Sequence, residues 1–440
     1  RLDLDRLAHL IDRLVLNRDK DDTQVIDPSR VGPVDVRRLP QTDSERVARR
    51  HAADRGEAAL AAGEVAAVLV AGGQGTRLGF DAPKGTYPIG PVSGASLFQI
   101  HAEKLVALGK RFGKSIPLYI MTSPENHRAT VSYFGEHNQF GLDHVRFFVQ
   151  GQLPAVDAKT GKLLLAAKDS LALSPDGHGG TITALASRND SDQRSCLEEM
   201  QDRGIKTIFY FQVDNPLVQI CDPAFLGLHL MEEADLSFKV VEKLRPEEKV
   251  GVVVRVDGRA QVIEYSDLPK ELAERREPDG SLQLWAGSIA IHCFNRLFLE
   301  RLAGSGGQLP VHRADKKVSY IDDSGQIVEP KEPNAVKFET FIFDALPLAD
   351  RWTIVETERA TEFEPLKNAT GFDSPATVRQ RLSDLFGDWL EQAGARVLRR
   401  ADGSVPFGIE ISPLLALDAA ELKRKIEPGL VVDRPVYLGP

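Results

Sequence analysis

Apolar and polar positions follow two kinds of pattern along this chain. Short, nearly continuous apolar runs recur between Glu64 and Ala360, and stretches with helical spacing, such as Ser96 to Leu108, lie between them. Runs of this kind are typical of strands that are covered on both faces. Their alternation with helices predicts a doubly wound, Rossmann-like α/β domain. We expect strands over Ala66–Ala71, Pro117–Thr122, Val145–Gln150, Thr207–Val213 and Leu236–Val241.

Two further patterns lie towards the C-terminus. Asp257-Gly258 separates the apolar runs Val250–Val256 and Gln261–Tyr265. This is a hairpin signal, and it predicts a mixed sheet. Beyond Gly371 the pattern changes to one long helix, Ser374 to Ala393, followed by short strands. We expect a small C-terminal domain there.

The first 60 residues are polar and rich in helical signals. We expect a second helix in this segment, with its N-cap at Asp43. The segment is therefore interpreted as a helical cap on the main domain. The first helix has one apolar face, formed by Leu2, Leu4, Leu7, Leu10, Ile11 and Leu14. The expected division is a cap over residues 1–60, a main α/β domain over 61–370 and a C-terminal domain over 371–440.

Composition narrows the class of protein. A chain of 440 residues is too long for one compact core, and its net charge of −9 argues against broad nucleic-acid binding. No apolar stretch reaches the roughly 18 residues that span a bilayer. The scattered Cys196, Cys221 and Cys293 have no metal-binding spacing, so we expect them to be reduced and buried. We expect a cytosolic protein without a membrane or nucleic-acid partner. Its oligomeric state does not follow from the sequence.

The strand predicted to end at Ala71 runs into a glycine-rich loop, Gly72-Gly73-Gln74-Gly75-Thr76-Arg77, and a lysine follows at Lys84. Glycine backbone can approach an anion without a Cβ in the way, and Arg77 and Lys84 supply the positive charge that a polyphosphate needs. A P-loop would require a Gly-Lys-Ser/Thr ending, and a dinucleotide fingerprint would require glycine at Leu78. The loop therefore predicts a phosphate site of another kind.

Asp214 follows the run Thr207–Val213. The carboxyl ends of parallel strands meet at the edge of the sheet where ligands bind. Asp214 and the glycine loop therefore fall on the same edge. Mg²⁺ prefers carboxylate oxygens shared with substrate phosphates, so we predict that Asp214 holds Mg²⁺. A turn aspartate before Pro216 is the structural alternative.

Other candidates have weaker signals. Gln150 ends a strand and could bind the edge of a base, and a second glycine loop, Pro175–Gly180, could pack against a base or a sugar. Glu264 could bind sugar hydroxyls. By pattern alone these could equally be a strand-end residue, a surface turn and an exposed strand residue. Phe341 and Phe343 have strand spacing and could simply be core residues. Lys367, taken alone, is typical of a surface charge.

Taken together, these segments resemble the eukaryotic-type UDP-N-acetylglucosamine pyrophosphorylases, within the wider UDP-sugar pyrophosphorylase family. The resemblance covers the chain from about residue 60 to the C-terminus, in the order of that family. The matching segments are Leu69–Gly79, Pro83–Gly85, Leu97–Ile100, Tyr119–Ser123, Phe147–Pro154, Pro175–Gly180, Val213–Asn215, Lys239–Lys243, Gly251–Gly258, Val262–Ser266, Phe341–Asp344, Pro365–Ala369 and Glu410–Pro413.

The resemblance implies a fold of the nucleotidyltransferase type, with residues 61–370 as the catalytic domain. It implies an enzyme that joins UTP to a sugar 1-phosphate with Mg²⁺ and releases pyrophosphate. The implied roles are as follows: Gly72, Gly73, Gln150 and Gly177 bind the nucleotide; Arg77, Lys84 and Lys367 contact the reacting phosphates; Asp214 binds the metal; and Gly251, Glu264, Phe341 and Phe343 bind the sugar.

The chain departs from that pattern mainly on the sugar side. His178 stands where the N-acetylglucosamine enzymes typically have asparagine, and Ser288 ends a segment that also differs. We count both as sugar-site candidates. N-acetylglucosamine 1-phosphate is the favoured acceptor, while a glucose 1-phosphate or broad-specificity enzyme stays open. From other classes, a glycosyltransferase and a non-catalytic nucleotide-sugar binding protein also stay open. A dehydrogenase is disfavoured because the third glycine and the expected acidic residue are missing.

Overall fold

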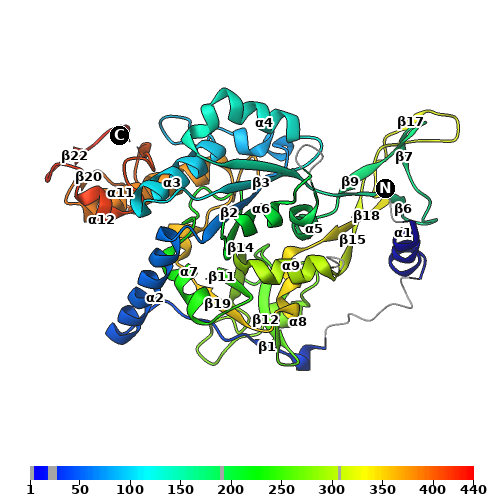
Figure 1. The fold of residues 1–440 in the computed structure, drawn as a ribbon, viewed down its shortest axis with the longest axis horizontal. Coiled ribbons are helices and arrows are strands. Elements are labelled where there is room, and N and C mark those ends of the chain that lie inside the picture. Colours follow the sequence, from blue (N-terminus) through cyan, green and yellow to red (C-terminus); the bar gives the residue numbers. More distant parts are fainter. Residues whose placement is uncertain (1–3, 18–26, 189–192, 306–308) are drawn as a thin grey trace.

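A ten-stranded mixed sheet forms the centre of the molecule (Figure 1). The computed structural model describes residues 4–17, 27–188, 193–305 and 309–440. The strands of the main path follow the order β1 (Val31–Pro33), β12 (Val252–Val256), β14 (Ala286–Asn295), β10 (Thr207–Gln212), β2 (Val65–Val70), β3 (Leu118–Thr122) and β4 (Val145–Val149). β11 (Leu236–Glu242) pairs with β14 and with β19 (Trp352–Glu356), and β13 (Arg259–Ile263) pairs with β12.

The strand directions place the chemistry on one edge. β10, β2, β3 and β4 are parallel, while β14 runs antiparallel between β10 and β11. The loops that follow β2, β4 and β10 therefore leave the sheet on the same side. The predicted mixed α/β architecture is confirmed, and each predicted strand of the main sheet forms within two residues of its expected bounds. The hairpin β12–β13 also forms, and Asp257 and Gly258 both adopt positive φ at its turn.

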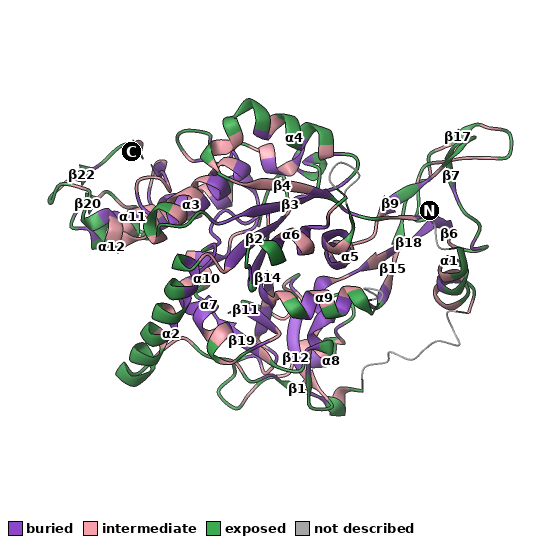
Figure 2. Cartoon of the chain, in the orientation of Figure 1, coloured by how far each residue is buried: buried purple, intermediate pink, exposed green. Residues whose placement is uncertain are grey.

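Strand β2 shows why its sequence is apolar throughout. Its residues Val65, Ala67 and Leu69 belong to one core cluster, whereas Ala66 and Val68 belong to a second. Successive side chains of a strand point to opposite faces, so both faces of this sheet are covered. Figure 2 shows the buried strands in the middle, with the exposed surface on the surrounding helices.

Helices cover both faces of the sheet. The first core takes residues from α3 (Leu97–Phe112), α7 (Pro223–Met231) and α11 (Pro375–Gln392), and the second takes residues from α5 (Thr181–Ala186), α6 (Cys196–Asp202) and α9 (Arg296–Gly304). Three further helices are α4 (His127–Glu136), α8 (Lys270–Ala273) and α10 (Arg359–Glu362). None of the helices in the described part of the chain combines the length and apolarity that crossing a bilayer requires.

The N-terminal segment contacts the molecule in separate places. α1 (Leu4–Ile11) packs on a small sheet of β15 (Val311–Lys316), β18 (Ala335–Thr340) and β6 (Val156–Asp157), at the end remote from the C-terminus (Figure 1). β1 extends the main sheet, and α2 (Asp43–Ala61) packs along α7. Leu2 of the predicted apolar face lies outside the described residues. The N-cap prediction at Asp43 is wrong by one residue: Thr42 accepts from the Glu45 N–H, and the Glu45 carboxylate reaches back to the Thr42 N–H.

The C-terminal residues form their own cluster beyond α11. The predicted long helix is confirmed, with Ser374 as its N-cap. After it come α12 (Ala419–Lys423) and two parallel strand pairs, β20 (Arg396–Val397) with β22 (Val431–Val432) and β21 (Ile409–Ile411) with β23 (Val436–Leu438). The predicted domain boundaries at residues 60 and 370 stay predictions.

Candidate active site

The glycine loop after β2 folds back on itself. The Gly75 N–H donates to the Ala82 carbonyl at 2.9 Å, and the Lys84 N–H donates to the Gly73 carbonyl at 3.1 Å. A Cβ on Gly75 would lie 2.7 Å from the Phe80 carbonyl oxygen, so this glycine is required by the turn itself. A Cβ on Gly73 would meet no described atom within 4 Å. The backbone there is therefore open to a ligand, as the sequence predicts for a phosphate loop.

Asn126, which the sequence analysis did not single out, anchors this loop. Its side-chain amide donates to the Ala71 carbonyl at 2.8 Å, and its Oδ1 accepts from the Ser123 N–H at 2.9 Å. Asn126 is fully buried. It therefore ties the exit of β2 to the exit of β3, and it fixes the position at which Gly72 and Gly73 leave the sheet.

Lys84 and Asp214 meet at the edge of the sheet. The Lys84 Nζ lies 3.6 Å from Asp214 Oδ2, with side-chain exposures of 19% and 13%. Among the described residues, no group donates a hydrogen bond to the Asp214 carboxylate. A mostly buried carboxylate without a donor is expected to have another cation as its partner. The two side chains thus lie where phosphate and a metal ion could enter between them.

A second loop is fastened to the one that carries Asp214. The Leu366 N–H donates to the Asp214 carbonyl at 2.8 Å. The Asn215 side chain donates to the Glu362 carbonyl at 2.8 Å and accepts from the Glu364 N–H at 3.2 Å. These bonds set the backbone of Lys367, one residue after Leu366, relative to Asp214.

A buried ion network supports both loops from behind. The Lys239 ammonium is fully buried and lies 2.5 Å from Glu362 Oε1 and 2.8 Å from Asp222 Oδ2. Burial opposes the charge of Lys239, but the two carboxylates outweigh burial and raise its pKa. Removing one partner would leave an uncompensated buried charge, so the network resists rearrangement. From the sequence, Lys239 belongs to one of the segments that carry the family resemblance, but its ion pairs could not be predicted because Asp222 and Glu362 are distant in sequence.

A cavity of about 210 Å³ opens beside Asp214 and Lys367. Many of the predicted sugar residues line it. The lining includes His178, Gly251, Glu264, Ser288 and Phe343, together with the apolar side chains of Val250, Val262, Ile289 and Ile291. These residues come from five separate segments of the chain. The structure therefore brings these predicted sugar residues to one cavity with Asp214 and Lys367, whereas Phe341, Lys84 and Arg77 do not line it.

His178 is held as a neutral ring. Its Nδ1 accepts from the Ile342 N–H at 3.2 Å, which leaves Nε2 to carry the proton. Burial, with a smaller contribution from His312, lowers the pKa of His178 to about 4. His178 thus offers a neutral N–H donor at the sugar cavity.

Phe341 and Phe343 do not form the predicted strand. β18 ends at Thr340, and a 3₁₀ turn begins at Ile342. The two rings nevertheless stack with centroids 5.0 Å apart, and both lie against His178. Phe341 keeps an extended backbone, with φ −117° and ψ 134°, but Phe343 lies inside the 3₁₀ turn Ile342–Leu348, so the two residues do not share a strand.

Gln150 and Gly177 are in direct contact. The Gln150 side-chain nitrogen donates to the Gly177 carbonyl at 2.6 Å, and Gln150 Oε1 would lie 3.0 Å from a Cβ on Gly72. Gly177 has φ +84°, and a Cβ there would lie 2.3 Å from the Thr340 carbonyl oxygen. Both features require glycine at this position. The predicted nucleotide residues Gln150 and Gly177 therefore lie next to Gly72 of the glycine loop.

Glu264 lies just after β13 and so is not the alternating strand residue considered from the pattern. Burial raises the pKa of its carboxyl, and Asp267 raises it further. Near it is a pair that sequence analysis missed: His312 Nε2 lies 2.7 Å from Asp344 Oδ2. Burial lowers the pKa of His312, but the bond and charge of Asp344 outweigh burial and raise it. No motif signals this pair, because 32 residues separate its members.

Arg77 occupies the outer part of the glycine loop. It lies in the 3₁₀ turn Thr76–Leu78 and is exposed. In the part of the chain that the structure describes, its guanidinium has no ion pair. Its predicted contact with a triphosphate stays a prediction.

The geometry agrees with the comparisons with known proteins. The family model for UTP–glucose-1-phosphate uridylyltransferase matches residues 4–374. The chain belongs to this family. It is therefore a nucleotidyltransferase, as the sequence predicted. Since its relatives share the enzyme class as well as the fold, the dehydrogenase and glycosyltransferase alternatives fall away.

This uridylyltransferase has relatives whose names include the word pyrophosphorylase. It is 39% identical to human UDP-N-acetylhexosamine pyrophosphorylase-like protein 1, over 92% of this chain and 83% of that protein. It is 41% identical to UDP-N-acetylglucosamine pyrophosphorylase of Saccharomyces cerevisiae, over 86% of this chain and 78% of that protein. A crystal structure of the Trypanosoma brucei uridine diphosphate N-acetylglucosamine pyrophosphorylase with an inhibitor has a TM-score of 0.81 and 25% identity. That match covers 98% of this chain and 90% of the other.

Proposed function

We propose that this uridylyltransferase forms UDP-N-acetylglucosamine and pyrophosphate from UTP and N-acetylglucosamine 1-phosphate. The single observation that carries the proposal is the cavity in which Asp214 and Lys367 lie beside an apolar wall and the polar groups of His178 and Glu264. The apolar wall suits an acetyl methyl group, and the polar groups suit sugar hydroxyls. The names of the yeast and trypanosomal relatives support the same sugar.

The proposed reaction is a direct in-line displacement. A phosphate oxygen of the sugar 1-phosphate attacks the α-phosphorus of UTP, a new P–O bond forms, and the bond to the β-phosphate oxygen breaks. The attacking oxygen is already anionic near neutral pH, so no enzyme nucleophile is needed. Lys84 and Arg77 stabilise charge on the leaving pyrophosphate, and Lys367 offsets the repulsion between the reacting phosphates. Gly72, Gly73, Gln150 and Gly177 hold the nucleotide.

Mg²⁺ fits the residues present. Within the described ranges, no group of three or more histidine, cysteine or acidic residues could hold a metal ion on its own. Mg²⁺ usually takes only one or two protein carboxylates and completes its shell with substrate phosphates and water. Asp214, a carboxylate without a hydrogen-bond donor, is suited to that role. When bound, Mg²⁺ would neutralise phosphate charge.

One observation supports glucose 1-phosphate as a second candidate acceptor. His178 and Ser288 line the sugar cavity at the positions where the chain departs from the N-acetylglucosamine pattern. Gly251, Glu264, Phe341 and Phe343 would contact either sugar. We further propose the cytosol as the compartment, since Cys221 and Cys293 are buried and form no disulfide.

Pyrophosphate release from UTP and Mg²⁺ across a panel of sugar 1-phosphates tests the proposal. We expect kcat/KM for N-acetylglucosamine 1-phosphate to exceed that for glucose 1-phosphate by about tenfold or more, since one well-placed group in a pocket supplies differences of this size. Equal or better use of glucose 1-phosphate would assign the second acceptor. Binding of UDP-sugar without any pyrophosphate release would indicate a non-catalytic binding protein.

A further inference from the structure

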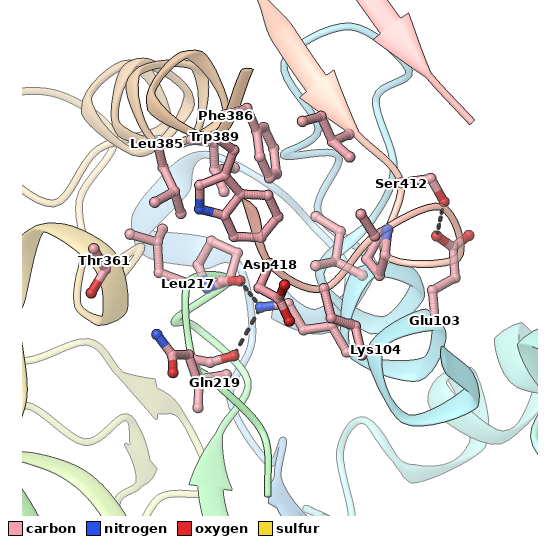
Figure 3. A pocket seen from close by; sticks show the side chains of 18 of the residues that line it. Glu103, Lys104, Leu217, Gln219, Thr361, Leu385, Phe386, Trp389, Ser412 and Asp418 are labelled. Carbon is pink, nitrogen blue, oxygen red and sulfur yellow. Dashed lines mark hydrogen bonds between the residues drawn. The ribbon is translucent and has the colours of Figure 1, made fainter. Parts of the chain in front are cut away.

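A larger cavity lies between the C-terminal residues, α3 and the loop that follows β10 (Figure 3). Its volume is about 620 Å³. Small-molecule sites typically occupy roughly 300–1,000 Å³. Its walls are α3, the loop from Pro216 to Asp222, α11, and the segment from Glu410 to Ala420. None of the reaction residues proposed above lines it.

The lining is apolar and aromatic. Phe386 and Trp389 of α11 meet edge to face, with ring centroids 5.4 Å apart, and both line the cavity. Leu217, Leu385 and Leu417 extend this surface. Aromatic rings prefer to stack with other flat rings at such distances. The lining therefore suits a flat aromatic molecule.

Apart from the exposed Glu358, the charged groups of the cavity already have partners. Arg111 lies 2.8 Å from Asp418, and the Glu103 carboxylate accepts from Gln99 at 2.8 Å and from Ser412 at 3.1 Å. Glu410 accepts from the backbone N–H groups of Val92 and Ser93, Asp222 pairs with Lys239, and Glu358 is exposed to solvent. A charged ligand would be desolvated without a partner, which is unfavourable. The ligand class is therefore uncharged.

One wall of this cavity is the loop Pro216–Asp222, which directly follows Asp214 and Asn215. Val218 is fully buried and lines both this cavity and the sugar cavity. The Lys104 ammonium of α3 donates to the Pro216 carbonyl at 2.6 Å and to the Val218 carbonyl at 2.8 Å. Figure 3 shows Lys104 reaching this loop from the cavity side.

We propose that the cavity between α3, α11 and the loop Pro216–Asp222 binds an uncharged, flat aromatic molecule, and that its occupancy weakens UTP binding. Lys84 and Asp214 lie 3.6 Å apart in this structure, and in the proposed reaction they separate as phosphates enter between them. A molecule that fits the cavity as it stands stabilises this arrangement over the substrate-bound one. The second half of the proposal rests on the proposed function, whereas the binding half does not.

The binding half is tested with N-phenyl-1-naphthylamine, an uncharged aromatic probe whose emission rises in apolar surroundings. We expect saturable binding at one site. Ala420→Glu, on exposed α12 at the lining, and Trp389→Ala should each weaken binding by about tenfold or more. Trp352→Phe, outside the lining, is the matched control and should bind like the parent. Thermal unfolding checks that each variant is folded. If Trp389→Ala does not fold, Ala420→Glu alone tests the binding site.

The coupling half is tested by titrating UTP and Mg²⁺ calorimetrically with and without saturating probe. We expect the UTP dissociation constant to rise by about fivefold or more, a typical size for coupled sites. No saturable probe binding, or equal binding by Ala420→Glu and the parent, overturns the site. Probe binding with unchanged UTP affinity overturns the coupling. Probe binding that depends on Ala420 in a protein that does not bind UTP would leave the site standing and overturn the proposed function.

Discussion

At the scale of single residues, the site contains a carboxylate without the hydrogen-bond donors that such a group usually has. Asp214 is mostly buried, yet its carboxylate has no hydrogen-bond donor in the described chain, and Lys84 is its nearest cation at 3.6 Å. A structural aspartate in a turn would normally accept backbone N–H groups. The bond from the Leu366 N–H goes to the Asp214 carbonyl instead, so the backbone holds the loop and the carboxylate stays available.

Lys84→Ala tests the charge at this point. We expect turnover to fall by about a hundredfold or more, because a preorganised cation contributes roughly 2–4 kcal/mol to such a transition state. Pyrophosphate release measured at saturating substrates gives the change. Lys114→Ala, which removes an exposed lysine elsewhere, is the control and should keep parental turnover. Turnover of Lys84→Ala equal to that of the control would remove Lys84 from the mechanism.

Asn215→Ala tests the link between the two loops. It removes the bonds to the Glu362 carbonyl and from the Glu364 N–H. We expect kcat to fall by about tenfold to a hundredfold, because Lys367 would no longer be held in register with Asp214. The affinity for UTP, measured separately, should change much less. Asn368→Ala removes only an exposed bond to the Phe372 carbonyl and should leave kcat unchanged. A loss of affinity with intact kcat would contradict a positioning role.

At the scale of elements, helix packing depends on two glycines. A Cβ on Gly227 of α7 would lie 1.6 Å from the Ala52 carbonyl oxygen of α2, and a Cβ on Gly56 would lie 2.0 Å from the Pro223 carbonyl oxygen. The two helices therefore touch backbone to backbone. Glycine weakens an isolated helix, so its presence here reflects the close approach.

Gly227→Ala should destabilise the protein by about 3 kcal/mol, at the upper end of the usual effect of overpacking, because the obstacle is backbone and cannot rotate away. Urea unfolding at constant pH measures the loss. Gly135→Ala in α4, where a Cβ would meet no described atom within 4 Å, is the matched control. It should be neutral or stabilising by about 0.5 kcal/mol. Equal stabilities for the two variants would mean that the helices lie farther apart than in the structure.

The elements also show what a single sequence can predict. β2 and β10 are continuous apolar runs because both faces of each are buried, so their place and the loops after them could be predicted from pattern alone. The stacking of Phe341 on Phe343 could not be derived from strand spacing, since a 3₁₀ turn produces it. The Lys239–Glu362 pair and the His312–Asp344 pair join residues far apart in the chain. Local periodicity carries no information about such pairs, which only the tertiary fold brings together.

At the scale of the whole molecule, several buried histidines make stability depend on pH. Burial is the largest cause that lowers the pKa in each case: His101 and His292 to about 3, and His178 and His229 to about 4. The ordinary histidine value is 6.5. Between these values the unfolded chain binds more protons than the folded protein, so stability is highest above 6.5 and falls as the pH drops. Carboxyls with a raised pKa, such as Glu264, act in the opposite direction, so one histidine must be isolated.

His292→Phe isolates that contribution. The ring of His292 is fully buried on β14, with its centroid 5.3 Å from that of Tyr210 and 4.0 Å from that of Phe238, and neither ring nitrogen has a partner among the described residues. Phenylalanine has a similar shape and no unpaired polar atom, so we expect it to stabilise the protein by about 1–3 kcal/mol at neutral pH. The advantage should grow by about 2 kcal/mol between pH 7.5 and pH 5, because the parent alone must then keep an imidazole neutral. Urea unfolding of parent and variant at both pH values measures this difference. A difference that stays constant with pH would mean that the folded protein protonates His292 as readily as the unfolded chain does, and therefore that this part of the core admits a charge.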